Sequence, residues 1–263
     1  IVHTHQHGQN SFSVQDNSEE EHFFRTAHNR IHHTNNIHAS LVLSSPTDII
    51  GRVWLSDGNN HLLECIRIIG RRFRYIRDYS NTDTDIISFD RQIRAFGDQF
   101  QPVLKRLHIG VVGAGGTGSS VFEQLVRLGI GTITIIDDDS FDASNVNRVY
   151  GSYSTDGGLH KVLIAKRSAN VIGLGTKVIN INRPITYEAS IKYLRDCDVV
   201  FGCTDDQAGR SLLTRFAVYY LTPVIDIAVA INPNEDGTIE RVEGRVTVLM
   251  PGTACLYCRN RIT

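Results

Sequence analysis

A glycine-rich turn between a short apolar strand and a helical pattern constrains this chain more than any other feature. Residues 107–112 are expected to form the strand, Gly113-Ala114-Gly115-Gly116-Thr117-Gly118 follows directly, and a helix-period run then reaches Leu128. Glycines in this spacing let the backbone turn tightly and approach phosphate oxygens, while the helix N-terminus offers N–H donors. The next expected strand, 132–136, is followed by Asp137, whose carboxylate can accept hydrogen bonds from a ribose. The pattern predicts a nucleotide site, and the loop alone does not distinguish NAD(P) from ATP.

Strands and helices alternate through the rest of the C-terminal part. Further strands are expected at 177–181, 199–201 and 224–229, and further helices at 159–172, 187–195 and 206–220. Short apolar strands that alternate with helices indicate a mainly parallel sheet covered on both faces. We therefore predict an α/β, doubly wound, Rossmann-like domain over residues 86–263.

The N-terminal part has a different pattern. Strands are expected at 39–43, 49–54 and 62–69, and a loop with a helix start at 9–21. The polar run 77–85 is the best linker candidate, so we predict a separate α+β unit over residues 1–80. Because Ile1 and Val2 run straight into a histidine cluster, we also expect an earlier part of the same domain to precede Ile1.

Composition and charge narrow the classes of function. Of the 263 residues, 41% are hydrophobic and 21% are charged, so the chain can form a packed core in one large domain or two modest ones. The net charge of −1 supplies no global attraction for nucleic acid or anionic lipid. No apolar run approaches the ~18 residues of a membrane span. We expect a cytoplasmic protein with no nucleic-acid partner and no membrane partner.

Charged residues that follow the later strands favour ATP over a dinucleotide. Ser144-Asn145-Val146-Asn147-Arg148 follows the second strand, Lys161 lies at a helix start, and Cys203-Thr204-Asp205-Asp206 follows the strand at 199–201. Arginine and lysine neutralise a triphosphate and the charge that develops on it. An aspartate at the carboxyl end of a strand is well placed to bind Mg²⁺. An NAD(P) dehydrogenase, which transfers hydride, does not need this combination of arginine, lysine and a Mg²⁺-binding aspartate.

The order of these stretches resembles the ThiF/MoeB/HesA family, whose adenylating fold is shared with ubiquitin-activating enzymes. The similarity covers residues 88–263, and the matching stretches are Asp90-Arg91-Gln92-Ile93, 113–119, 136–139, 144–148, Lys161, 203–206 and Pro251-Gly252-x-x-Cys255-x-x-Cys258. The resemblance implies ATP and Mg²⁺ as cofactors. It also implies adenylation of the C-terminal carboxylate of a ubiquitin-like protein, release of pyrophosphate, and a homodimer.

The resemblance also implies roles for single residues. The nucleotide would be bound by Gly113, Gly115, Gly116, Gly118, Asp137, Ser144, Asn145, Arg148, Lys161 and Asp205. Within this set, Asp137 would bind the ribose, Asp205 would hold Mg²⁺, and Asn145, Arg148 and Lys161 would hold the phosphates. The catalytic residues would be Arg148, Lys161, Asp205 and Arg91, with Arg91 reaching into the partner subunit's ATP site. Cys255 and Cys258 would be half of a structural zinc site, whose second C-x-x-C would lie beyond Thr263.

A spacing typical of metal ligands occurs at the start of the chain, where His3-x-His5 is followed by seven residues and then Ser13-x-x-Asp16. Two histidines one residue apart on a strand point to the same side, and a carboxylate from a helix start can complete three zinc ligands. The fourth position stays open for water, and Ser13 Oγ can hydrogen-bond a developing oxyanion. The spacing resembles the JAMM (MPN/JAB) metalloprotease motif of deubiquitinases, over residues 1–75. Gln6 replaces that family's usual proline, and its general-base glutamate lies upstream of the histidine pair.

Together the two resemblances imply an activating enzyme for a ubiquitin-like modifier, fused to a JAMM-type zinc isopeptidase. The fusion would belong to a bacterial system that conjugates ubiquitin-like modifiers to proteins. Its partners would be the modifier and a conjugating enzyme. A first alternative is a sulfur-carrier adenylyltransferase of the thiamin or molybdopterin type, which shares every ATP residue named above. A second is an inactive scaffold that binds modifiers, against which the intact Arg91, Arg148, Lys161 and Asp205 argue. An NAD(P) dehydrogenase is the least favoured.

Overall fold

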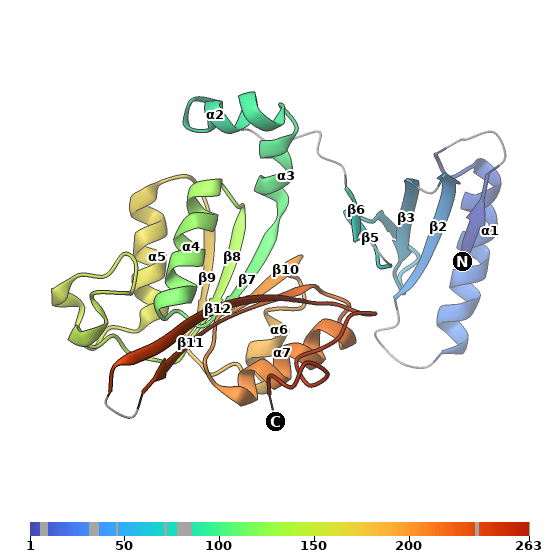
Figure 1. Cartoon of the computed structure of the whole chain (residues 1–263). Coiled ribbons are helices and arrows are strands. Elements are labelled where there is room, and N and C mark those ends of the chain that lie inside the picture. The colour runs from blue at the N-terminus through green and yellow to red at the C-terminus, as the bar shows by residue number, and fades with distance from the viewer. Residues whose placement is uncertain are drawn as a thin grey trace. The chain divides into compact units, whose positions relative to one another are not determined.

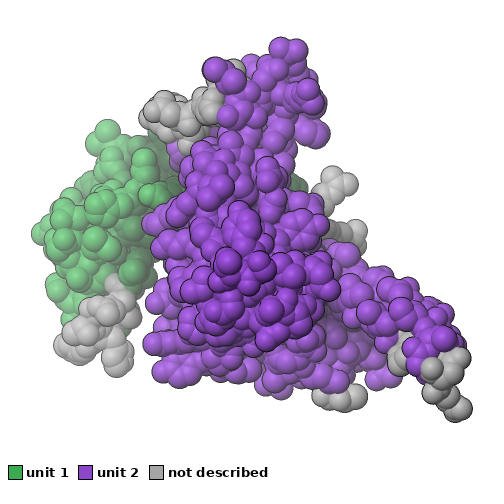
Figure 2. Space-filling view, turned by 90° about the vertical axis from the view of Figure 1, so that its left-hand side faces the viewer, with its two compact units in different colours: residues 1–78 green, residues 79–263 purple. Residues whose placement is uncertain are grey.

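A computed structural model describes residues 1–5, 10–31, 37–45, 47–70, 73–77, 86–234 and 237–262. The chain divides into two compact units, Ile1–Asp78 and Tyr79–Thr263 (Figure 2). Most of the linker expected at 77–85 lies outside the described residues. Within the described ranges, no helix is both long enough and apolar enough to cross a membrane.

The first unit contains a four-stranded sheet and a separate hairpin. The sheet has the order β1-β2-β3-β4, and its strands are β1 (Val2–Thr4), β2 (His38–Ser45), β3 (Asp48–Trp54) and β4 (Asn60–Leu62). Strand β1 is parallel to β2, and the other pairs are antiparallel. The hairpin consists of β5 (Cys65–Ile68) and β6 (Arg74–Arg77).

The strands expected at 39–43 and 49–54 are confirmed as β2 and β3, but the single strand expected at 62–69 is wrong. Leu62 pairs with Arg52 in the four-stranded sheet, whereas Cys65 pairs with Arg77 in the hairpin. The chain therefore leaves one sheet for the other at Leu63 and Glu64, and Glu64 is the one sign of the break within this mainly apolar run.

Helix α1 (Val14–Arg30) connects β1 to β2 and packs on the sheet. It begins where Ser13 and Asp16 form a capping box, in which each side chain accepts a hydrogen bond from the other residue's backbone N–H. Its buried residues are Glu20 and Phe24, and the Phe24 ring stacks on Trp54 and His38 of the sheet. The helix start expected within 9–21 is therefore at Val14.

The second unit is built on a six-stranded sheet of order β12-β11-β10-β7-β8-β9 (Figure 1). Its strands are β7 (His108–Val112), β8 (Thr132–Ile136), β9 (Lys177–Ile181), β10 (Val199–Gly202), β11 (Val224–Pro233) and β12 (Ile239–Leu249). All neighbouring pairs are parallel except β11 and β12. The prediction of a Rossmann-like, mainly parallel α/β sheet is confirmed for this unit.

Helices cover both faces of this sheet (Figure 1). The helices of this unit are α2 (Ile86–Phe96), α3 (Phe100–Arg106), α4 (Gly116–Leu128), α5 (Lys161–Ile172), α6 (Glu188–Lys192) and α7 (Gln207–Tyr219), with 3-10 turns at Ala143–Asn145 and Ser154–Asp156. Of these, α2 packs beside α3 and away from the sheet faces (Figure 1). One buried cluster joins α4 and α5 to Val111, Ile133 and Ile135. The other joins α7 to Val112 and Val200. Alternate residues of each strand thus enter opposite cores, as expected for a sheet buried on both sides.

Candidate functional site

A cavity of about 520 Å³ lies at the carboxyl ends of β7, β8 and β10 in the second unit. Parallel α/β sheets bind ligands at this edge. Most of the residues expected to bind a nucleotide line the cavity, and they are Gly113, Gly115, Gly116, Asp137, Asn145, Arg148, Lys161 and Asp205. Segments up to 92 positions apart in the sequence, from Gly113 to Asp205, therefore meet at one place.

The glycine loop needs its glycines for close packing as well as for access. Gly113 has a φ of +93°, and a Cβ there would lie 2.7 Å from the Cys203 carbonyl oxygen. A Cβ on Gly118 would lie only 1.8 Å from the Gly113 carbonyl oxygen. Gly115 caps α4 without a side chain and faces open space. Gly115 and Gly116 thus offer the helix N-terminus to the cavity, whereas the buried Gly118, which is not among the described lining residues, closes the turn beneath it.

Asp137 holds the glycine loop against the end of β8. Its Oδ2 accepts a hydrogen bond from the Ala114 N–H at 2.6 Å, and its Oδ1 accepts one from the Asp139 N–H at 2.9 Å. Burial raises the pKa of Asp137 despite these hydrogen bonds. Each carboxylate oxygen keeps a second lone pair, so Asp137 can still accept a ribose hydroxyl.

The two cations that line the cavity, Lys161 and Arg148, are held in place by different means. The Lys161 ammonium lies 2.6 Å from Asp139 Oδ2, and its side chain is only 11% exposed. The Lys161 N–H also donates to the Asp139 carbonyl oxygen, so Asp139 fixes both ends of this residue. Arg148 donates from Nη1 to the Ser144 carbonyl oxygen at 3.2 Å, and its aliphatic stem packs beside Gly116. Ser144 itself is exposed and not among the described lining residues.

The turn after β10 presents Asp205 to solvent at the cavity. Asp206 is committed to the fold, because its side chain caps α7 through the Gly209 N–H and bonds Thr204 Oγ1. Burial, together with the negative charge of Asp226, raises the pKa of the Cys203 thiol to about 12. Cys203 is therefore protonated at neutral pH and unsuited to be a nucleophile, which agrees with a packing role.

Arg91 lies apart from the described lining of the cavity, and the cavity also has lining residues that the sequence did not predict. Arg91 is exposed on α2 and is not among the described residues that line the cavity, so its role in a partner's site stays a prediction. Sequence reasoning missed Asp139 and the wall formed by Pro184, Ile185 and Thr186 after β9. Asp139 had a signal in the run Asp137-Asp138-Asp139, whereas the 184–186 segment had none, because only the sheet order brings β9 to this edge.

The sequence pattern of the ThiF family matches residues 89–262, which is most of the chain. The chain belongs to the ThiF family. The "adenylyltransferase and sulfurtransferase UBA4" of Meyerozyma guilliermondii is 32% identical over 158 residues, which cover 59% of this chain but 35% of that protein. The molybdopterin-synthase adenylyltransferase of Escherichia coli is 26% identical over 185 residues, covering 69% of this chain and 70% of that enzyme.

A solved structure supports the ThiF fold. The E. coli tRNA N6-threonylcarbamoyladenosine dehydratase TcdA, crystallised with ATP, superposes with a TM-score of 0.53 and 20% identity over 66% of this chain and 88% of that one. At this identity the likeness concerns the fold. The chain spans about a third of the length of the yeast relative, so that relative's whole activity does not transfer with the match.

A second cluster lies in the first unit, outside the ThiF match. The two imidazole Nε2 atoms of His3 and His5 each lie 3.0 Å from a different carboxylate oxygen of Asp16, and 3.2 Å from each other. Among the described residues, these three form the group able to hold a metal ion, with ligand atoms within 4.8 Å of one another. Two imidazoles and one carboxylate with a further position open suit zinc.

Ser13 orients Asp16 in this cluster. The Ser13 N–H donates to Asp16 Oδ2 at 2.6 Å, and Ser13 Oγ accepts from the Asp16 N–H at 3.1 Å. Burial opposes ionisation of Asp16, but the Ser13 hydrogen bonds and the two imidazoles outweigh it, and the pKa of Asp16 is lowered. Ser13 Oγ is thus engaged with the backbone, and its predicted role toward an oxyanion stays a prediction.

Cys255 and Cys258 come together in the turn that follows β12. Their Sγ atoms lie 3.4 Å apart, the Cys258 backbone N–H donates to Cys255 Sγ, and hydrogen bonding with Cys258 lowers the pKa of Cys255. A lowered thiol pKa favours the thiolate that binds zinc. The described residues place no third ligand beside this pair, so the structural zinc site stays a prediction.

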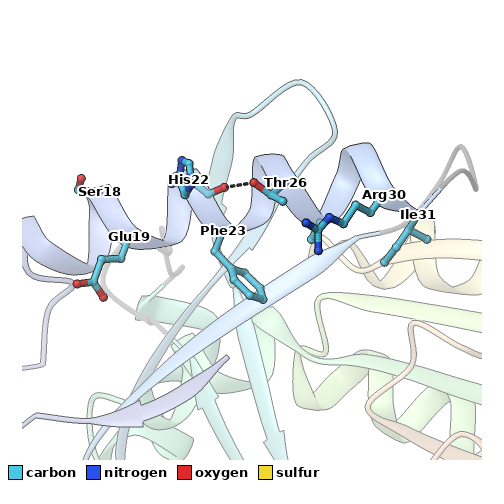
Figure 3. Close-up of a pocket in the computed structure, with 8 residues that line it drawn as sticks. Ser18, Glu19, His22, Phe23, Thr26, Arg30 and Ile31 are labelled. Carbon is cyan, nitrogen blue, oxygen red and sulfur yellow. Dashed lines mark hydrogen bonds between the residues drawn. The ribbon is translucent and has the colours of Figure 1, made fainter.

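A shallow groove of about 800 Å³ also runs along the exposed side of α1 (Figure 3). Its walls include Glu19, Phe23 and Ile31. Among the described residues, those that line the groove exclude the histidine cluster and form no group of three metal ligands.

Proposed function

We propose that this ThiF protein uses Mg-ATP to adenylate the C-terminal carboxylate of a small carrier protein. The observation that carries the proposal is the cavity, which gathers the glycine loop, Asp137, Arg148, Lys161 and Asp205 at one edge of the sheet. The names of the relatives favour a carrier of the sulfur-carrier type over a conjugated modifier, which reverses the order of preference drawn from the sequence. A conjugating enzyme as partner stays a prediction.

The charges of the cavity argue for a divalent cation. Five carboxylates (Asp137, Asp138, Asp139, Asp205 and Asp206) and two cations (Arg148 and Lys161) line it. A triphosphate would not enter a cavity of net negative charge without added positive charge. Asp205 would hold Mg²⁺, which would supply that positive charge beside the phosphates, since Mg²⁺ is commonly held by one or two carboxylates together with substrate phosphates.

Positioning and charge neutralisation account for the reaction. A carboxylate oxygen of the carrier forms a bond to the α-phosphorus, the bond from that phosphorus to the β-phosphate oxygen breaks, and pyrophosphate leaves. Lys161 and Arg148 stabilise the charge that develops on the phosphates, and the N–H groups of Gly115 and Gly116 orient them. No covalent bond to the protein is needed at this step.

An apolar face of the sheet supports a protein substrate. Ile231 lies opposite Val242 across the β11–β12 pair, and Ile227 lies opposite Val246, so all four point to one face. Val246, Ile231 and Val242 are 66%, 60% and 59% exposed. Contiguous exposed apolar residues mark interaction surfaces. We assign this face to the carrier protein, and the predicted homodimer partner is the competing occupant.

Nucleotide binding tests the proposal without knowledge of the carrier. Calorimetry on the full-length protein should detect Mg-ATP binding, and Asp205→Ala should abolish adenylate formation in ATP–pyrophosphate exchange with candidate carriers while the fold is retained. Asp98→Ala, an exposed aspartate outside the cavity, is the control. Unchanged exchange in Asp205→Ala would remove the Mg²⁺ assignment. Mg-ATP binding without exchange would instead favour the scaffold alternative.

We also propose that His3, His5 and Asp16 bind zinc in a JAMM-like processing domain. The convergence of two Nε2 atoms and a carboxylate supports this assignment. Metal analysis of full-length protein should show about one zinc fewer per chain in His3→Ala/His5→Ala than in the wild type. His61→Ala, an exposed histidine on β4, should leave the content unchanged. An equal zinc content in the double variant and the wild type would contradict the assignment.

A further inference from the structure

A buried carboxylate ties helix α1 to the sheet one turn beyond Asp16. Glu20 is 3% exposed. Its Oε2 accepts hydrogen bonds from Ser40 Oγ on β2 at 2.6 Å and from Trp54 Nε1 on β3 at 3.1 Å. The guanidinium of Arg52, also on β3, donates to the same oxygen from Nε at 3.0 Å and from Nη2 at 2.8 Å. Four donors from two strands therefore converge on one oxygen atom.

Arg52 extends this connection to both sides of the metal-ligand turn. It donates from Nη1 to Asn17 Oδ1, and its guanidinium carbon lies 3.8 Å from the centre of the Phe12 ring. Phe12 directly precedes Ser13 and Asn17 directly follows Asp16. The side chain of Arg52 thus contacts residues immediately before, immediately after and one turn beyond the Ser13–Asp16 segment.

Helix geometry converts this anchoring into a position for the Asp16 carboxylate. Residues four apart lie on the same face of a helix, so Asp16 and Glu20 face the sheet together. A slip of one residue would turn the helix by about 100° and shift it by about 1.5 Å, which would carry Asp16 away from the imidazoles. His3 and His5 come from β1 and the residue just after it, so the cluster forms only if α1 is held at a fixed rotation over the sheet.

Stability alone does not account for a buried ion pair at this place. Arg52 and Glu20 have side chains only 5% and 4% exposed. Apolar side chains of similar volume often replace buried ion pairs without loss of stability. An ion pair with several directional hydrogen bonds fixes one rotation and one position of α1 along the sheet. An apolar contact between helix and sheet does not, because it has no preferred direction.

We propose that the Glu20–Arg52 ion pair positions Asp16 for metal binding, so that this pair sets the affinity of the centre without ligating the metal. The inference rests on the zinc centre proposed above. Glu20 also borders, with His3 and Asp16, one cavity of about 440 Å³, which places it beside the cluster. All the donors to Oε2 come from the sheet side, so this oxygen belongs to the scaffold.

Zinc affinity measured on full-length protein tests this role. In competition with a chromophoric chelator, Glu20→Gln should bind zinc about 10- to 100-fold more weakly, as expected when a residue that supports a metal ligand is changed. Glu21→Gln is the matched control, because Glu21 is the neighbouring residue on α1, is exposed, and is not among the described residues that line the cavity beside the cluster or the groove shown in Figure 3. Its affinity should equal that of the wild type.

A second variant separates positioning from folding. Glu20→Leu/Arg52→Met replaces the pair by apolar side chains and is expected to fold. It should keep the zinc-free unfolding temperature and still lose zinc affinity, whereas a purely structural role would change only the unfolding temperature. Wild-type zinc affinity in either folded variant would overturn the positioning role. If the wild type binds no more zinc than His3→Ala/His5→Ala, the zinc centre itself fails and the positioning role fails with it.

Discussion

Replacement of Gly118 by alanine should damage the nucleotide site through packing alone. The added Cβ would lie 1.8 Å from the Gly113 carbonyl oxygen, and ordinary contact starts at about 3.4 Å, so the backbone of the loop must move by more than an ångström. The atom in the way is backbone and has no rotamer by which to escape. Overpacking of this kind destabilises by about 1–3 kcal/mol. The helix propensity of alanine offsets at most about 1 kcal/mol of this.

The displacement should also lower the reaction rate, because Gly113 and Cys203 form the wall of the cavity. A misplacement of about 1 Å in a site that works by positioning can lower the rate about 100-fold. Far-UV circular dichroism should show the lower stability, while the fluorescence of Trp54, the chain's one tryptophan, reports on the first unit and should not change. Pyrophosphate exchange should show the lower rate.

Gly115→Ala is the matched control for stability. No atom lies within 4 Å of a Cβ at Gly115, and its φ of −72° suits any residue. The change alters only the residue that caps α4, so we expect less than about 1 kcal/mol. If Gly118→Ala unfolds and reacts like the wild type, or if Gly115→Ala is the less stable of the two, the close packing inferred for this loop is wrong.

Two further predictions concern buried groups of the ThiF unit. Asp226 is 2% exposed and accepts hydrogen bonds from Arg210 Nε at 3.0 Å and from Arg210 Nη2 at 2.9 Å. Asp226→Asn should therefore destabilise this unit by about 3–5 kcal/mol in denaturant unfolding. The exposed Glu243→Gln is the control, and equal stability of the two variants would refute the importance of the ion pair. With a pKa of about 12, raised from 9.0, the Cys203 thiol gains reactivity only as the pH rises toward 12. At pH 8 the Cys203 thiol should carry about a thousandfold less thiolate than an ordinary cysteine, so it should resist alkylation by iodoacetamide while the exposed Cys258 reacts. Mass spectrometry measures the labelling of each cysteine, and equal labelling of the two would contradict the burial of Cys203.

The parallel strands of the ThiF unit could be predicted because local sequence determines them. The expected strands at 132–136 and 177–181 have the observed bounds, and the helix expected at 206–220 is α7 with Asp206 as its cap. Each is a compact segment bounded by turn residues, and β8 is buried on both faces, from Ile133 to Ile136. Burial on both faces leaves little room for another interpretation.

Strand β12 was missed, because it lacks the compact apolar run by which the parallel strands were recognised. Most of its residues are exposed, and its charged residues Glu240, Arg241, Glu243 and Arg245 interrupt the valines. The segment is a strand because it pairs along its length with β11, from Val224–Leu249 to Pro233–Ile239. The same pairing extends β11 beyond the expected end at Val229. The valines at 242, 246 and 248 lie two or four residues apart, so the segment carries the alternation of a strand exposed on one face, a signal that sequence reasoning missed.

The candidate nucleotide residues could be predicted because each follows a strand, and the carboxyl ends of parallel strands meet at one edge. Spacing could not show that the Lys161 ammonium is held by Asp139, 22 residues away in the sequence, or that Gly118 closes the loop. Such pairings depend on the conformation of the segment between them. The sequence therefore indicates which chemical groups reach the cavity, and the structure determines which of them are engaged with one another.

Asp16 and Glu20, both on helix α1, show the same difference between a residue whose role the sequence indicates and one whose role only the structure shows. His3, His5 and Asp16 are recognisable because their spacing along the chain is itself the signal. Glu20 looks in sequence like part of the acidic run 19–21, which suggests an exposed face, yet it is buried because Arg52 and Trp54, more than 30 residues later, surround it. Only a folded sheet can supply such partners, since a carboxylate without them would stay in water. The ligands of a metal centre can therefore be legible in a sequence while the groups that orient them are not, and a chain that keeps the three ligands but lacks Arg52 should bind its metal more weakly.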